Sequence, residues 1–94
     1  MINGNIDEFI NCIHYGEELW FTFNGETYFL EGMTVNEKNV LFLYEMKDGG
    51  FSFEWEVEAG KPFPAEEFLA AKIWNGKNFL EIEADVRWTD TELG

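Results

Sequence analysis

The chain has 94 residues and carries 6 Lys and Arg against 19 Asp and Glu, which gives a formal net charge of −13 at pH 7. This length predicts a single domain, residues 1–94, without room for a deep, separately walled active site. The charge repels nucleic-acid phosphates and anionic membranes, so we expect neither as a partner; it either attracts a basic protein surface or cations, or serves only to keep the chain soluble.

The N-terminal residues and the single cysteine bear on the cellular compartment. Cys12 is the only cysteine, which excludes an internal disulfide and suits a reducing environment. The start MINGNIDEF lacks the basic and apolar regions of a secretory signal. No apolar run approaches the roughly 20 residues needed to cross a bilayer. We therefore expect a cytoplasmic protein.

The first predicted element is a short amphipathic helix from Ile6 to about His14. Asn5 is a suitable N-cap with Glu8 as its capping-box partner, and Gly16 is a suitable stop. The apolar residues recur at helical spacing, at Ile6, Phe9, Ile10 and Ile13. This apolar stripe predicts that the helix covers one face of a sheet.

Residues 18–31 predict a β-hairpin, because Asn24-Gly25 joins two alternating runs and suits a type I′ turn. A two-residue turn places Phe21 opposite Tyr28. One face then carries Leu19, Phe21, Phe23, Tyr28 and Leu30, and the other carries Trp20, Thr22, Thr27 and Phe29.

Two further strands are predicted after this hairpin. Residues 33–35 extend the second strand, residues 36–39 form a turn, and residues 39–47 form a third strand. The third strand is apolar on both sides in its middle, which predicts cover on both faces. Residues 48–50 form a turn into a fourth strand over residues 51–58. Its alternation assigns Phe51, Phe53, Trp55 and Val57 to the core face, and Ser52, Glu54, Glu56 and Glu58 to the other.

The C-terminal third predicts short helices after a connector over residues 59–64. A helix is expected from Ala65 to about Ala71. Residues 78–86 suit either a helix, with Asn78 and Glu81 as a capping box, or a strand; we favour the helix, with residues 86–88 extended and residues 89–94 frayed. The predicted fold class is α+β, with an N-terminal helix, a four-stranded antiparallel meander and one or two short C-terminal helices.

Residues that could carry catalysis are few. Cys12 and His14 lie about 200° apart around the predicted helix, so they cannot share a metal ion or form a nucleophilic pair. Calcium-binding and phosphate-binding loop motifs are absent from the sequence. We therefore expect no enzyme, no cofactor and no metal site. An acid–base pair among the 19 carboxylates stays open, because folding can bring any two together.

The hairpin face opposite the core is the candidate partner-binding surface. Trp20 and Phe29 lie opposite each other on it and can act as an aromatic anchor within an acidic rim. The candidate residues are Glu18, Trp20, Phe29, Glu31, Glu54, Glu56 and Glu58. In the alternative, the C-terminal segment with Trp74 and Trp88 folds over this face and buries it. The carboxylates of the fourth strand could equally be a solvated surface that discourages edge pairing.

The C-terminal run FLAAKIWNGKNFLEIEADV, residues 68–86, resembles the tails of small bacterial α+β proteins of the pattern FxxAKIxxGKxLxEIxxxV. The run departs from that pattern at Phe79. The resemblance implies the fold and a bacterial origin. In size, acidity and lack of catalytic residues the chain also resembles immunity proteins that neutralise basic bacterial toxins, a likeness that assigns no role to any residue.

These observations lead to three hypotheses about function. The first is a small acidic non-enzymatic protein-binding module, such as an inhibitor or immunity protein for a basic partner. The second is a small-ligand-binding or enzymatic domain with a Trp- and Tyr-lined pocket between sheet and helices. The third is a homo-oligomer assembled through Trp20 and Phe29.

Overall fold

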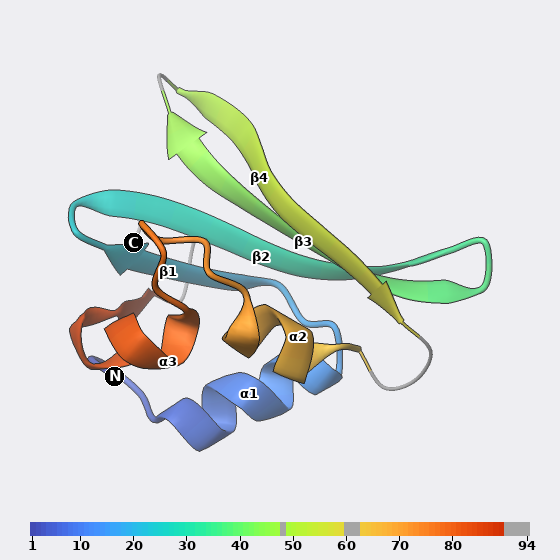
Figure 1. The fold of residues 1–94 in the computed structure, drawn as a ribbon, viewed down its shortest axis with the longest axis horizontal. Helices are drawn as coiled ribbons and strands as arrows, with labels where there is room; N and C mark the ends of the chain where they lie inside the picture. Colours follow the sequence, from blue (N-terminus) through green and yellow to red (C-terminus); the bar gives the residue numbers. More distant parts are fainter. Residues whose placement is uncertain (48, 60–62, 90–94) are drawn as a thin grey trace.

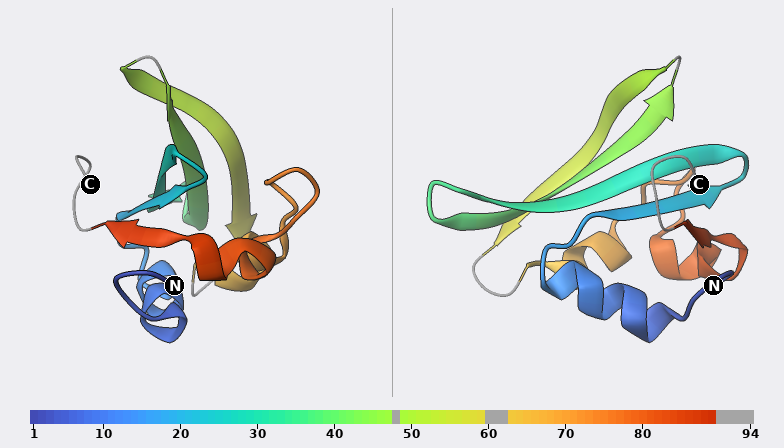
Figure 2. Two further views of the ribbon diagram at one scale, coloured as in Figure 1. Left: turned by 90° about the vertical axis from the view of Figure 1, so that its left-hand side faces the viewer. Right: turned by 180° about the vertical axis from the view of Figure 1, so that it is seen from behind.

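The computed structural model describes residues 1–47, 49–59 and 63–89, and it has an α+β fold (Figure 1). The elements in chain order are α1 (Ile6–His14), β1 (Leu19–Phe23), β2 (Glu26–Val35), β3 (Lys38–Lys47), β4 (Gly50–Ala59), α2 (Ala65–Ala70), α3 (Phe79–Ile82), the 3-10 turn η1 (Glu83–Asp85) and β5 (Arg87–Thr89). The strands form one sheet in the order β4-β3-β2-β1-β5. The helices all lie against the same face of this sheet (Figures 1 and 2).

The sheet has five strands, so the prediction of four was wrong. The additional strand, β5, pairs antiparallel with β1 and places Trp88 opposite Phe21. Thr89, which was predicted to fray, belongs to β5 and is 9% exposed. A strand of three residues is too short to show an alternating pattern, so only its pairing with β1 identifies it. Residues 90–94 lie outside the described part of the chain.

The predicted register of the first hairpin is confirmed, with Phe21 opposite Tyr28. Asn24 and Gly25 have φ angles of 54° and 83°, as a type I′ turn requires. The turn between β2 and β3 is shorter than predicted, because Asn36 and Glu37 alone connect the two strands. The predicted turn over residues 48–50 and the connector over residues 59–64 include residues 48 and 60–62, which lie outside the described residues.

The helix ends follow the capping signals. In α1 the Asn5 side chain accepts a hydrogen bond from the Glu8 backbone N–H at 2.8 Å. In α3 both bonds of the predicted capping box between Asn78 and Glu81 are present, each at 3.0 Å. The helical alternative for the start of residues 78–86 is therefore confirmed.

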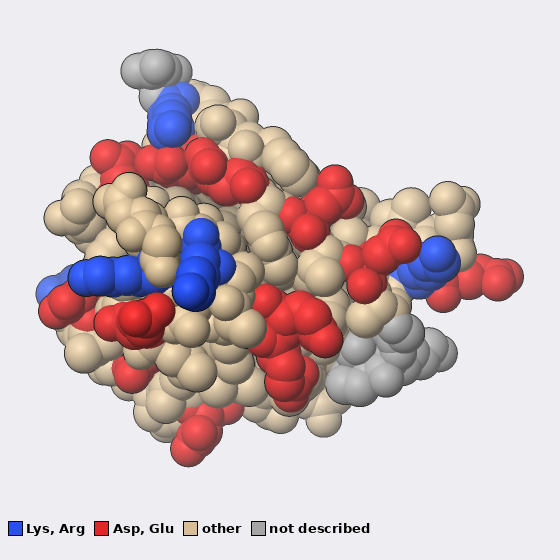
Figure 3. Space-filling model, viewed as in Figure 1, with Lys and Arg blue, Asp and Glu red and all other residues tan. Residues whose placement is uncertain are grey.

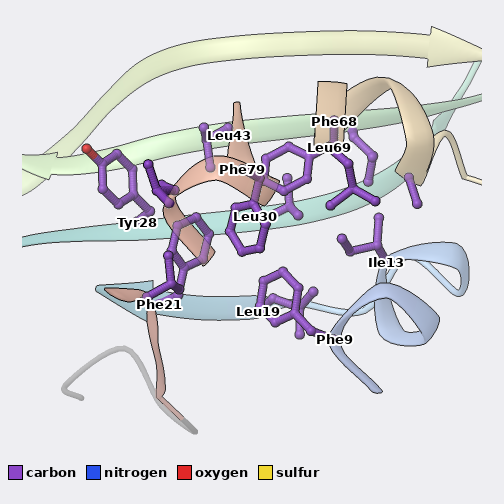
Figure 4. Close-up of a cluster of buried hydrophobic side chains, with 14 of the residues drawn as sticks. Phe9, Ile13, Leu19, Phe21, Tyr28, Leu30, Leu43, Phe68, Leu69 and Phe79 are labelled. Carbon is purple, nitrogen blue, oxygen red and sulfur yellow. The ribbon is translucent and has the colours of Figure 1, made fainter. Parts of the chain in front are cut away.

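The main core lies between the helices and the face of the sheet that they cover, which we call the inner face (Figure 4). Phe9 of α1 stacks on Phe79 of α3 with ring centroids 5.2 Å apart. Phe21 of β1 meets the same Phe79 ring edge to face at 5.5 Å. These rings, together with Phe68, are fully buried. The stripe predicted for the first helix therefore covers the sheet as expected.

A β-bulge in β4 changes which side chains face the core. Leu43 of β3 lies opposite Trp55, but the next residue, Tyr44, lies opposite Phe53. Glu54 is thus an extra residue, and the alternation along β4 shifts by one at this point. Trp55 and Val57 pack against the core. Phe51 and Phe53 lie on the other face, so their predicted place in the core was wrong.

The strand β3 is interior to the sheet, but the prediction that it is covered on both faces was also wrong. Leu41 and Leu43 belong to the main core. Phe42 and Tyr44, which alternate with them, lie on the opposite side, which we call the outer face, and are half-buried. No helix of the described residues covers this side (Figure 2).

Candidate functional site

An aromatic row crosses the outer face of the sheet. Each of its members lies directly opposite the next on the neighbouring strand, in the order Trp20, Phe29, Tyr44, Phe53. Trp20 and Phe29 stack with ring centroids 4.3 Å apart and planes inclined by 24°. The centroid of Tyr44 lies 6.3 Å from that of Phe29 and 6.0 Å from that of Phe53. The row therefore continues across four strands from β1 to β4.

Phe51 packs over this row from the start of β4. Its ring centroid lies 6.0 Å from Phe29, 6.1 Å from Tyr44 and 5.9 Å from Trp20. The strands β4 and β1 are not neighbours in the sheet. The contact between Phe51 and Trp20 therefore depends on the strong twist of the sheet that Figure 2 shows. Phe29 is only 8% exposed as a result, although Phe51 itself is 55% exposed.

Carboxylates border the aromatic row on one side. Glu31 of β2 and Glu56 of β4 flank Phe42 of β3 in the adjacent cross-strand row. Burial raises the pKa of Glu31, and the Glu18 carboxylate raises it further. Burial also raises the pKa of Tyr44, with smaller contributions from Glu31 and Glu56. The carboxylates therefore lie close enough to the aromatic row to act on it electrostatically.

The rings and one carboxylate enclose a small hollow on the outer face, which we call the aromatic hollow. It has a volume of about 160 Å³ and is lined by Phe29, Glu31, Tyr44 and Phe51. The sequence predicted Phe29 and Glu31 as site residues but not Tyr44 or Phe51. Tyr44 was assigned to a strand covered on both faces, and Phe51 was assigned to the core because the sequence gives no signal for the bulge.

The predicted site residues are brought together only in part. Trp20, Phe29, Glu31 and Glu56 share the outer face. Glu58 lies further along the same face opposite Val40 and forms an ion pair with Lys38 at 3.3 Å.

Glu54 is separate from the other predicted site residues. It lies in the bulge and approaches Lys47 at 3.7 Å, and Lys47 also contacts Glu45 at 3.3 Å. The predicted row of three carboxylates was therefore wrong, because the bulge breaks the alternation that defined it.

The alternative in which Trp74 and Trp88 cover the outer face is also wrong. Trp74 is 6% exposed and belongs to the main core, where its ring meets Tyr28 edge to face at 5.8 Å. Trp88 packs edge to face on Phe9 of α1 at 5.3 Å. Both tryptophans therefore lie on the helix-covered side of the sheet.

A larger cleft of about 570 Å³ lies between the β1–β2 turn and the segment from Ile73 to Asp85, which includes α3. It is lined by Phe23, Asn24, Glu26, Tyr28, Ile73, Trp74, Asn75, Lys77, Ile82 and Asp85. Burial raises the pKa of Tyr28, and the Glu45 carboxylate adds to this effect. The Trp74 indole N–H is buried near the Tyr28 hydroxyl, but the two groups do not meet hydrogen-bond geometry.

Cys12 and His14 have separate roles in packing. Burial, together with the nearby Glu17 carboxylate, raises the pKa of Cys12 to about 11, so the thiol is protonated at neutral pH. His14 Nε2 lies 3.3 Å from Glu66 Oε1 and links α1 to α2. In residues 1–47, 49–59 and 63–89, we find no group of three or more His, Cys, Asp or Glu side chains placed to hold a metal ion.

Comparisons with known proteins give no independent assignment. No protein-family model, curated protein or solved structure matches the chain. Within the described ranges, no helix has the length and apolar character required to span a membrane.

Proposed function

We propose that the chain is a non-enzymatic binding protein for a basic partner protein, as an inhibitor or immunity protein is, and that the outer face is its contact surface. The observation that carries the proposal is an aromatic row, covered by no helix of the described residues, beside the carboxylates of Glu31 and Glu56. Phe51 and Phe53 are 55% and 52% exposed on this face. Clustered exposed aromatic side chains are typical of the anchors of protein interfaces.

The charge distribution supports a basic partner. In the described part of the chain, the ion pairs involve other carboxylates and leave Glu18, Glu31 and Glu56 without a Lys or Arg partner. On the side of the molecule that carries α2 and α3, which Figure 3 draws, acidic side chains also form several groups and outnumber the basic ones. Such a field steers a positively charged protein towards the surface and slows its escape at low salt.

An affinity pull-down from a lysate of the native cell tests this proposal. We expect the tagged chain to retain a basic protein at low salt and to lose most of it at high salt. The variant Phe53→Ala removes an exposed ring of the aromatic row and should lose this protein. The control Tyr15→Ala removes an aromatic side chain that is 73% exposed at the end of α1 and should retain it.

Two outcomes of the pull-down would contradict the proposal. Equal retention by the parent and Phe53→Ala would place the contact surface elsewhere. If nothing is retained at either salt, the cleft lined by Tyr28 and Trp74 becomes the leading site, because its volume of about 570 Å³ suits a small ligand. Light scattering on the parent and on Trp20→Ala separates this result from self-association, since only a homo-oligomer formed through Trp20 would change its mass.

A further inference from the structure

The aromatic hollow has a geometry that suits one small group. Its three rings come from three adjacent strands, and their centroids are 6.3 Å apart for Phe29 and Tyr44, 6.0 Å for Phe29 and Phe51, and 6.1 Å for Tyr44 and Phe51. The planes of Phe29 and Tyr44 are inclined by 22°, whereas the Phe51 ring is turned by 67° from Tyr44. The rings thus present walls of different orientation to the hollow.

The volume of the hollow limits what can enter it. The 160 Å³ of the hollow is well above the roughly 10–15 Å³ that a single water molecule requires, so the hollow has room for a small group. A guanidinium or ammonium group with its nearest methylene groups is such a group.

The electrostatics of the hollow favour a cation over an anion or a neutral group. The faces of aromatic rings carry partial negative charge and attract ammonium and guanidinium groups. Glu31 adds a carboxylate to the lining. Glu18 interacts electrostatically with Glu31, and both Glu31 and Glu56 interact with Tyr44. None of these groups is positively charged. The attraction of a bound cation would offset the burial and the repulsion from Glu18 that now disfavour the charge on Glu31.

We propose that the aromatic hollow binds the side chain of one lysine or arginine of the partner protein, with Phe29, Tyr44 and Phe51 contacting the cationic group and Glu31 supplying the countercharge. This inference rests on the proposed function and specifies its anchor. The rest of the aromatic row and Glu56 then contact the surface around that side chain.

The test uses small probes of the side chain, so it does not require the partner. Aromatic and backbone NMR signals are followed while N-acetyl-arginine amide or N-acetyl-lysine amide is added up to about 100 mM, a range that detects millimolar binding. N-acetyl-norleucine amide is the control, since it resembles lysine in shape and has no charge. We expect saturable shifts at Tyr44 and Phe51 with both cationic probes and not with the neutral one.

Matched variants separate the hollow from the surrounding surface. Phe51→Leu and Glu31→Gln should each weaken probe binding by about fivefold, the loss expected for one cation–π or charge contact. Phe53→Leu is the control, because Phe53 lies on the same strand at nearly the same exposure, 52% against 55%, but does not line the hollow. It should bind the probes as the parent does.

The outcomes distinguish this inference from the proposed function. Absence of saturable shifts, equal shifts with the neutral probe, or equal weakening in Phe53→Leu would each overturn the anchor. If the anchor fails in this way while the pull-down still retains a partner that Phe53→Ala loses, the proposed function stands without it. If the probes bind as expected and the pull-down retains no protein, the proposed function fails and the cation site remains.

Discussion

Phe29 shows how the outer face acquires order although no helix of the described residues covers it. The residue is 8% exposed because Trp20 stacks on it, Tyr44 lies beside it and Phe51 packs over it from β4. A small cluster of this kind, separate from the main core, holds neighbouring side chains in fixed positions. The proposed contact surface is therefore preorganised, which would reduce the entropy lost if a partner binds there.

Glu31 is the residue at which function and stability should oppose each other. Burial and the nearby Glu18 raise the pKa of Glu31 above its ordinary value, so the folded state disfavours its charge. A carboxyl whose pKa is higher in the folded than in the unfolded state lowers the free energy of unfolding as pH rises through the interval between the two values. That cost persists at neutral pH and disappears when the carboxyl is protonated in both states.

We predict that Glu31→Gln raises the urea midpoint of unfolding at neutral pH and that its advantage vanishes below about pH 4. Solvent screening of this half-buried side chain limits the gain to less than about 1 kcal/mol. The control Glu67→Gln removes an exposed acid from the first turn of α2 and should lower the midpoint slightly. A lower midpoint for Glu31→Gln at neutral pH would contradict this account.

The bulge in β4 determines which side chains of this strand lie on the outer face. One extra residue, Glu54, lets Trp55 and Val57 face the core while Phe51 and Phe53 join the aromatic row. Bulges also increase the local twist of a strand. That twist helps to carry Phe51 across the sheet to Trp20, with ring centroids 5.9 Å apart.

Deletion of Glu54 should be tolerated, because it removes the unmatched residue and leaves Phe53 opposite Tyr44 and Trp55 opposite Leu43. We expect a change of less than about 1 kcal/mol in the free energy of unfolding, since the exposed contact with Lys47 contributes little. Deletion of Glu56 removes the same residue type but turns either Trp55 or Val57 out of the core, with an expected loss of about 2 kcal/mol or more. Urea unfolding followed by circular dichroism measures the free energy of unfolding of both deletion variants. An equal decrease in the two would contradict the assignment of Glu54 as the extra residue of the bulge.

The sequence predicted those elements whose signals are local. Asn24-Gly25 set the hairpin register, and Asn78 with Glu81 marked the start of α3. The bulge could not be predicted, because FSFEWEVE is compatible with an unbroken alternation and the shift depends on pairing with β3. The three-residue strand β5 depends in the same way on β1, more than sixty positions earlier in the chain.

At the scale of the whole molecule, the two faces of the sheet are packed differently. The inner face and the helices bury the main core, which includes the fully buried rings of Phe9, Phe21, Phe68 and Phe79. The outer face is left to a smaller aromatic cluster and its acidic border. This division explains why the candidate site was predicted in part: its central pair, Trp20 and Phe29, follows from hairpin register, whereas its remaining members depend on the curvature of the whole sheet.

The most direct test of the central claim is the association rate constant between the chain and the basic protein retained in the pull-down, measured at increasing salt. Glu56→Lys reverses a charge on the outer face, and Glu67→Lys makes the same change at an exposed position of α2. The account predicts that Glu56→Lys slows association at low salt by about tenfold, that the difference shrinks at high salt, and that Glu67→Lys stays close to the parent. Equal slowing by the two variants would show that net charge alone attracts the partner, and it would contradict the assignment of the outer face as the binding surface.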